Sequence, residues 1–298
     1  MDKIRINILH HRHHTEARTK GAIIRHLARK WKEEGHVVTH LYGCDKYESA
    51  DVLILHIDLS CIPDEYVAFS QRFPKVVNLG LTDIRKRTIS RNLLSKECPY
   101  EGPVIIKADL NCGGAPERLL GVTPKKRPIS LMRGIKKRLK IKDPFSIRKP
   151  KDYLIYPKKS KVPRAVFSNE SLVVEKFLPE KHGDEYYQRR YYFFGDAEYH
   201  EIHATSVAIH ATDSDDHCIR YWEEPSIPPA LRSYRKELQA DYGKIDYVIH
   251  DGKIVVFDVN RTPSSGDIET DSIAAVWVKS IVDRLHVGIA KAPIVDNQ

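Results

Sequence analysis

The sequence of 298 residues contains no long hydrophobic run. Its longest strongly apolar stretch, Val52–Ile57, is far shorter than the roughly 20 residues that a membrane-spanning helix needs. The N-terminal residues become charged again after a few apolar positions and show no cleavage-site pattern, so we expect no secretory signal. These absences predict a cytoplasmic protein with no membrane partner.

Cysteine, glycine and proline are also scarce. The five cysteines are widely spaced and form no Cys-x-x-Cys pair, which favours a reduced protein over a disulfide framework or a zinc site. With 15 glycines and 17 prolines, the chain is neither collagen-like nor of low complexity. Its length and its 41% of hydrophobic residues instead predict a folded protein of about two domains.

The charge of the chain is positive. Lysine and arginine total 49 and aspartate and glutamate 40, which gives a net charge of +9. Much of the excess lies in the proline-punctuated segment 122–165, whose role the sequence leaves open. A positive charge predicts an anionic partner, and its sign alone does not choose among nucleic acid, a phosphate-rich cofactor and an acidic substrate.

The first third of the chain alternates between strand and helix patterns. Strands are expected near residues 4–9, 36–42, 50–57 and 75–78. Helices are expected from Thr15 to Glu34, after Pro63, and from Thr82 or Asp83 to Leu94. This alternation predicts a parallel sheet covered on both faces, in an α/β domain of residues 1–98.

The rest of the chain, residues 99–298, has more strands than helices. Strands are expected near residues 103–107, 172–178 and 188–194, and a hairpin joins residues 245–249 to 253–259 through Asp251-Gly252. Helices are expected near 129–141, 229–242 and 270–288. The pattern predicts an α+β domain built largely on antiparallel sheet.

The hairpin carries the clearest chemical signal. Asp258 and Asn260 lie two residues apart on one strand and therefore share a face, and the tight turn brings Asp246 beside them. Oxygen ligands of this kind suit Mg²⁺, which completes its shell with water and substrate phosphate. The plainer alternative is a solvated polar face.

Three further segments suggest contacts with a nucleotide. Lys107 ends an apolar strand and precedes Gly113-Gly114, so an ammonium group and backbone N–H groups can meet phosphate oxygens. The apolar strand 172–178 leads to Glu180, which suits an adenine pocket with a ribose contact. Arg190, beside Arg189, offers a forked donor to phosphate or carboxylate.

In their order along the chain, these motifs resemble the ATP-grasp superfamily of ATP-dependent ligases, which includes D-alanine–D-alanine ligase and glutathione synthetase. The resemblance covers about residues 100–263. It implies a pre-ATP-grasp α/β domain of residues 1–98, followed by a two-subdomain ATP-grasp fold. The lid-type subdomain would span roughly 99–175 and the C-terminal sheet subdomain roughly 176–298.

The resemblance also implies roles for individual residues. The implied nucleotide contacts are Lys107, Gly113, Gly114, Glu175, Lys176, Phe177, Leu178 and Glu180. The implied catalytic residues are Lys107, Arg190 and Lys244, and the implied Mg²⁺ ligands are Asp246, Asp258 and Asn260. The chain departs from the family pattern in having Asp258 where glutamate is frequent, Ser-Ser-Gly after Pro263, and a long basic linker.

The implied activity is an ADP-forming ligase that uses ATP and Mg²⁺ to activate a carboxylate as an acyl phosphate and join it to an amine. The substrates would be a small-molecule or peptide carboxylate and an amine acceptor, and a homodimer is an open alternative. Two other functions are kept: a kinase of the same fold that phosphorylates a hydroxyl, and a basic nucleic-acid-binding protein with a degenerate nucleotide site. The intact set of metal-ligand residues argues against the latter.

Two other features have no assigned role. His10, His11, His13 and His14 flank Arg12 directly after the first strand, where they suit a metal ion, an anionic substrate or merely a solvated loop. Cys112 has no recognisable base in the sequence, and we interpret it as a small loop residue.

Overall fold

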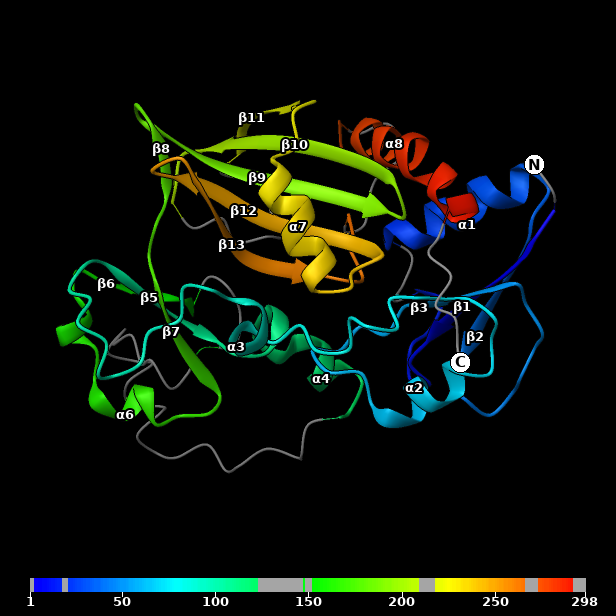
Figure 1. The fold of residues 1–298 in the computed structure, drawn as a ribbon, viewed down its shortest axis with the longest axis horizontal. Coiled ribbons are helices and arrows are strands. Elements are labelled where there is room, and N and C mark those ends of the chain that lie inside the picture. The colour runs from blue at the N-terminus through cyan, green and yellow to red at the C-terminus, as the bar shows by residue number, and fades with distance from the viewer. Residues whose placement is uncertain are drawn as a thin grey trace.

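The computed structural model describes residues 3–17, 21–122, 147, 152–208, 218–265 and 273–291. Within these ranges the strands form three sheets, which are well separated in Figure 1. None of the helices in these ranges has the length and apolar character needed to cross a membrane.

The first sheet is parallel, as the sequence predicts. Its order is β2-β1-β3-β4, and every adjacent pair runs in parallel. The strands are β1 (Arg5–His10), β2 (Val37–Tyr42), β3 (Val52–Leu55) and β4 (Val76–Val77). Helices α1 (Ile23–Glu33) and α2 (Asp64–Ser70) accompany them, and Pro63 is the N-cap of α2.

Two helices predicted in the first third of the chain are shorter than the sequence indicates, and the helix predicted near 229–242 ends at Glu237. Helix α1 begins at Ile23, with Ala22 rather than Thr15 at its N-cap. Helix α3 (Lys86–Ile89) is a single turn and does not continue to Leu94. The backbone N–H of Lys86 donates to the carbonyl of Asp109 and that of Leu94 to the carbonyl of Val174, so the segment is bonded to distant strands instead of to its own next turn.

The second sheet is small and antiparallel, with the order β6-β5-β7. It consists of β5 (Val104–Ala108), β6 (Leu154–Tyr156) and β7 (Leu172–Lys176). Between β6 and β7 the chain forms η5 (Lys159–Lys161) and α6 (Arg164–Phe167), and α6 lies beside this sheet in Figure 1. The predicted helix at 129–141 and most of the basic segment lie outside the described residues.

The third sheet has the order β11-β10-β9-β12-β13, and β8 pairs with β9. All its pairs are antiparallel, as the sequence predicts for this half. Its strands are β8 (Glu180–His182), β9 (Glu185–Phe194), β10 (Ala197–Thr205), β11 (Cys218–Glu223), β12 (Tyr242–His250) and β13 (Lys253–Asn260). Helix α7 (Pro229–Glu237) packs on one face through Leu231 and Tyr234.

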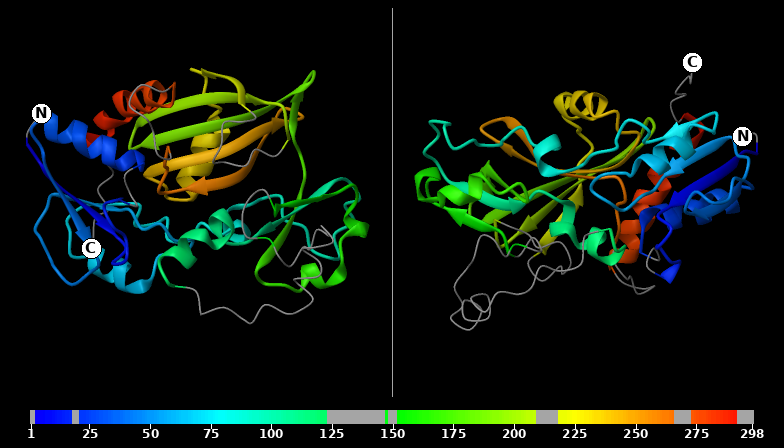
Figure 2. Two further views of the ribbon diagram at one scale, coloured as in Figure 1. Left: turned by 180° about the vertical axis from the view of Figure 1, so that it is seen from behind. Right: turned by 90° about the horizontal axis from the view of Figure 1, so that it is seen from below.

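The hydrophobic core continues across residue 98. Helix α8 (Ile273–Leu285), with η7 (His286–Lys291) after it, packs against α1 and against the face of the third sheet opposite α7, an arrangement visible in both views of Figure 2. The indole N–H of Trp31 donates to the carbonyl of His286 at 2.8 Å. One core cluster therefore joins the first and third sheets, while the second sheet has a cluster of its own.

Candidate functional site

The hairpin β12–β13 places two carboxylates face to face. Asp246 and Asp258 are partners in the strand register, and Lys244 is the partner of Asn260. The turn has Asp251 and Gly252 at φ of 49° and 72°, the conformation that this dipeptide favours. The predicted hairpin and the shared face of its polar residues are confirmed.

Each of these carboxylates forms an ion pair with a lysine. The ammonium group of Lys86, from α3, bonds to Asp258, and that of Lys244 lies 2.9 Å from Asp246. The side chains of Lys86 and Asp246 are both 3% exposed. Burial would lower the pKa of Lys86, but the charge of Asp258 outweighs it and raises the pKa above its usual value. Lys86 is therefore a buried cation, whereas Lys244 is half-buried.

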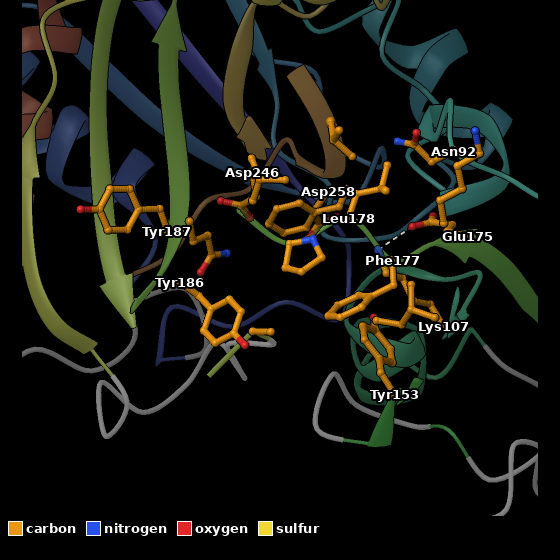
Figure 3. Close-up of a pocket in the computed structure, with 18 of the residues that line it drawn as sticks. Asn92, Lys107, Tyr153, Glu175, Phe177, Leu178, Tyr186, Tyr187, Asp246 and Asp258 are labelled. Carbon is orange, nitrogen blue, oxygen red and sulfur yellow. Dashed lines mark hydrogen bonds and ion pairs between the residues drawn. The ribbon is translucent and has the colours of Figure 1, made fainter. Parts of the chain in front are cut away.

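The second sheet forms the opposite wall of a cleft. Lys107 on β5 and Glu175 on β7 are in contact, with 2.6 Å between Nζ and Oε2. The Lys107 ammonium also lies 5.5 Å from the ring centroid of Phe257 on the hairpin. Figure 3 shows Lys107, Glu175 and Tyr153 on one side of this cleft and Asp246 and Asp258 on the other.

The cleft combines a polar and an apolar part. Its hinge side consists of Lys176, Phe177, Leu178 and Pro179, which follow β7. From the third sheet it is lined by Tyr186, Tyr187, Gln188, Thr205, Asp246, Val248, Val255, Phe257 and Asp258. A register shift after Asp246 lets the neighbours Phe257 and Asp258 both reach the cleft.

Lys86 and Tyr153 line the cleft although the sequence analysis did not select them. Lys86 lies between two arginines in a segment that predicts an ordinary basic helix, so its sequence neighbourhood gave no signal of burial. Burial raises the pKa of Tyr153, whose phenol stays neutral. Only the fold brings these two side chains to the cleft.

Glu180 does not line the cleft. Its carboxylate accepts two bonds from Arg189, at 2.7 and 2.9 Å, and one from the backbone N–H of Ile249 at 2.7 Å. Burial would raise the pKa of Glu180, but these donors lower it below the usual value. The carboxylate of Glu180 is thus bound to Arg189 and Ile249, and the structure does not place it at the cleft as the predicted ribose contact.

Arg190 lies on the same sheet face as the hairpin carboxylates but beside the cleft lining. It is the register partner of both Asp246 on β12 and Glu201 on β10. Its Nη1 is 3.9 Å from Oε1 of the fully buried Glu201. The arginine thus stands between two carboxylates, next to the predicted metal site.

Gly113 and Gly114 lie in a buried turn, η2 (Asn111–Gly114), between β5 and the short helix α4 (Ala115–Leu119). Both have positive φ, and the backbone N–H of Asn111 donates at 2.8 Å to Oγ of Ser60, which lies between β3 and α2. Burial, then the charge of Asp258, raises the pKa of the Cys112 thiol to about 12. The turn is therefore near Asp258, although neither glycine lines the cleft.

The residues at the hairpin fit a magnesium ion. Asp246 Oδ1 and Glu175 Oε1 are buried and have no hydrogen-bond partner among the described residues. Such atoms are costly unless a ligand satisfies them. Asp246 and Asp258 are hard oxygen donors of the type Mg²⁺ prefers, whereas the amide oxygen of Asn260 accepts bonds from Thr262. Two of the three predicted ligands therefore face the cleft.

The chain matches no protein-family model and no curated protein by sequence. By structure it is similar to a RimK domain protein ATP-grasp from Sphaerobacter thermophilus DSM 20745, with 11% identity and a TM-score of 0.50 over 97% of this chain and 100% of that one. The chain has the ATP-grasp fold. The fold implied by the resemblance of the motifs is thus confirmed.

Two further solved structures are similar at lower TM-scores. D-alanine–D-alanine ligase from Bacillus anthracis, complexed with ATP, has 14% identity and a TM-score of 0.44 over 97% of this chain and 99% of that one. A RiPP-associated ATP-grasp ligase from Chryseobacterium gregarium has 10% identity and a TM-score of 0.47 over 98% of both chains.

Proposed function

We propose that this ATP-grasp chain binds Mg·ATP in the cleft between its second and third sheets and acts as an ADP-forming ligase for a carboxylate and an amine. One observation supports this most strongly. The facing carboxylates Asp246 and Asp258 line one cleft together with two buried lysines, Lys86 and Lys107, and the half-buried Lys244 pairs with Asp246.

The two parts of the cleft suit the two parts of a nucleotide. The apolar hinge, with Phe177 and Leu178, offers a surface for a flat base, and Tyr153 adds an aromatic ring nearby. The lysines lie at the polar end, where they suit the phosphates. Because Lys107 is within 2.6 Å of Glu175, the carboxylate holds the ammonium in place until a phosphate competes for it.

Asp246 and Asp258 are the residues that would hold Mg²⁺. The ion supplies charge neutralisation on the phosphate oxygens when it is bound. In the structure the ammonium groups of Lys244 and Lys86 provide the positive charge that these two carboxylates require. Transfer of the lysines to phosphate would leave both carboxylates available to the ion.

The proposed reaction has two steps. A carboxylate oxygen of the substrate attacks the γ-phosphorus of ATP, and the bond to the β-bridging oxygen breaks, which gives an acyl phosphate and ADP. The amine then attacks the acyl carbon, loses a proton and displaces inorganic phosphate. Lys86 and Lys107 stabilise charge on the transferring group, and the enclosing sheets keep water from the acyl phosphate.

Hydroxamate formation tests the proposal. The chain is incubated with Mg·ATP, hydroxylamine and a panel of amino acids, acidic peptides and small carboxylates, while ADP is measured in parallel. We expect hydroxamate and ADP in equal amounts, and a loss of about 100-fold or more in Asp258→Asn. Asp251→Asn is the matched control, because Asp251 lies in the turn of the same hairpin with 92% of its side chain exposed.

Other outcomes separate the remaining functions. ADP production that requires a hydroxyl compound and yields no hydroxamate would favour a kinase. Failure to bind Mg·ATP in calorimetry would refute the proposed function. In that event, RNA binding that falls steeply with salt and is unchanged in Asp258→Asn would favour a nucleic-acid-binding protein.

A further inference from the structure

A group of histidines gathers at the carboxyl edge of the first sheet. His10 ends β1, His40 lies in β2 and His56 directly follows β3. The Nε2 of His10 is 2.9 Å from Nδ1 of His40, and the ring centroids of His10 and His56 are 5.1 Å apart. Parallel α/β sheets bind ligands at this edge.

The fold divides the histidines that cluster in the sequence. His14 joins the group, with its ring centroid 6.2 Å from that of His10. His11 instead packs against Tyr66, and Nδ1 of His13 is 2.7 Å from the carbonyl oxygen of Leu120. Two of the four therefore contribute to the buried group and two do not.

Several polar atoms of this group have no protein partner. They are Nδ1 of His10, both ring nitrogens of His56 and the hydroxyl of Tyr242, all buried and without a hydrogen bond in the described part of the chain. The ring of Tyr242 stacks on that of His56 at 6.4 Å. Each unsatisfied group is costly, so this concentration in the described part of the chain indicates a site that a polar ligand can complete.

The chemistry of the site favours an anion over a metal ion. Among the described residues, no three histidine, cysteine, aspartate or glutamate side chains are placed to hold a metal. The charged side chains that act on the imidazoles of His10, His40 and His56 are the cations Arg25 and Lys32. The acid that pairs with Arg25, Glu16 at 3.4 Å, has a side chain that is 87% exposed.

The electrostatics of the imidazoles also favour an anion. Burial first, and then the positive surroundings, lower the pKa of His56 to about 3 and that of His40 to about 4. The imidazoles are thus neutral N–H donors in a region of positive potential. An anion would relieve that potential and draw a proton onto the site.

Strand β12 connects this group to the proposed catalytic cleft. Tyr242, Lys244 and Asp246 alternate along the strand and share one face. Four residues of strand span about 13 Å, the length of a short extended peptide. This spacing matches a substrate with one carboxylate at His56 and Tyr242 and a second carboxylate at Asp246.

We propose that His10, His56 and Tyr242 bind a carboxylate of a peptide-sized acidic substrate, and that a second carboxylate of the same molecule is the one activated at Asp246 and Asp258. The buried polar atoms alone are the grounds for the carboxylate-binding site. Only its role as a substrate site rests on the proposed function.

Calorimetry with the full chain tests the proposal. The probes are tri-aspartate, its neutral counterpart tri-asparagine, and succinate, a dicarboxylate too short to reach the cleft. Tri-aspartate is expected to bind with uptake of protons, measured as a dependence of the heat on the ionisation enthalpy of the buffer. Succinate is expected to bind more weakly, and tri-asparagine not to bind.

Tyr242→Phe is the decisive variant, because it removes only a buried hydroxyl and preserves the ring. We expect it to bind tri-aspartate about tenfold more weakly with an unchanged or higher thermal midpoint. His56→Gln should abolish the proton uptake. His26→Gln, on helix α1 outside the group, is the matched control and should bind as the wild type does.

Each failure has a distinct reading. Equal binding of tri-aspartate and tri-asparagine, or wild-type affinity in Tyr242→Phe, would overturn the inference, and ordered water would then be the partner of these atoms. If the inference fails in this way while hydroxamate still forms with some carboxylate, the proposed function stands. If tri-aspartate binds and Tyr242→Phe weakens it, but Mg·ATP does not bind, the anion site stands and the proposed function fails.

Discussion

The ammonium group of Lys86 bonds to the carboxylate of Asp258, although the two residues are 172 positions apart in the sequence. Lys86 belongs to the single-turn helix that leads from the first sheet to the second, and Asp258 belongs to the last strand of the third sheet. This contact joins the connecting segment to the proposed metal site. It explains why a lysine whose side chain is only 3% exposed keeps its charge.

Replacement of Lys86 by methionine should reduce hydroxamate formation by about 100-fold, because a buried donor to the transferring phosphoryl group is removed. Steady-state kinetics with Mg·ATP as the varied substrate measures this. Lys158→Met alters an exposed lysine and serves as control. Wild-type rates in Lys86→Met would remove this residue from the proposed machinery.

Replacement of Arg261 by methionine should lower the free energy of unfolding by about 3 kcal/mol. The guanidinium is fully buried and donates to the carbonyl groups of Ile57, Leu59 and Leu81. It therefore connects the end of the hairpin to loops that follow the first sheet. Urea denaturation measures the loss. The control Arg284→Met removes an exposed ion pair with Glu223 and should change stability by less than about 0.5 kcal/mol.

Gly243 allows β12 and β13 to approach closely beside the proposed metal site. A Cβ atom at this position would lie 2.6 Å from the carbonyl oxygen of Asn260. Gly243→Ala should therefore cost about 2 kcal/mol of stability and reduce activity by displacing Lys244 and Asn260. Gly183→Ala, where nothing lies within 4 Å, should cost only about 1 kcal/mol and leave activity unchanged. Equal effects of the two substitutions on activity would refute the steric explanation.

The buried imidazoles should make stability depend on pH. The pKa of His56 is about 3 in the folded chain, below the ordinary value of 6.5, because burial disfavours the charged ring. The unfolded state then binds more protons, so stability is complete above about pH 6.5 and declines as the pH falls toward about 3. At about pH 5.5, His56 alone should cost about 1.4 kcal/mol relative to neutral pH.

Denaturation curves at several pH values test this dependence. The decline should be less steep in His56→Gln, and saturating tri-aspartate should also flatten it, since a bound anion stabilises the protonated ring. A profile that is flat between about pH 5 and 7 in the wild type would contradict the prediction, as would an identical slope in His56→Gln.

Sequence patterns predicted those parts of the site and the fold that depend on residues close together in the chain. The Asp251-Gly252 turn and the two-residue alternation of strands predicted a hairpin that carries Asp246 and Asp258 on paired strands, and the register shift after Asp246 places the two directly opposite each other. Alternating strands and helices likewise predicted the parallel first sheet. The helix expected to extend to Leu94 was wrong, because Lys86 and Leu94 form their backbone bonds with distant residues.

The sequence by itself determined most of the strands, the hairpin turn and the order of motifs that resembles the ATP-grasp family, because these follow from local turn chemistry and periodicity. Only the tertiary structure decided three contacts: Lys86 bonds to Asp258, Arg189 donates to the carboxylate of Glu180, and His56 stacks on Tyr242. These pairings join segments far apart in the chain. They are selected by the burial of a core shared between sheets, and no local pattern encodes that selection.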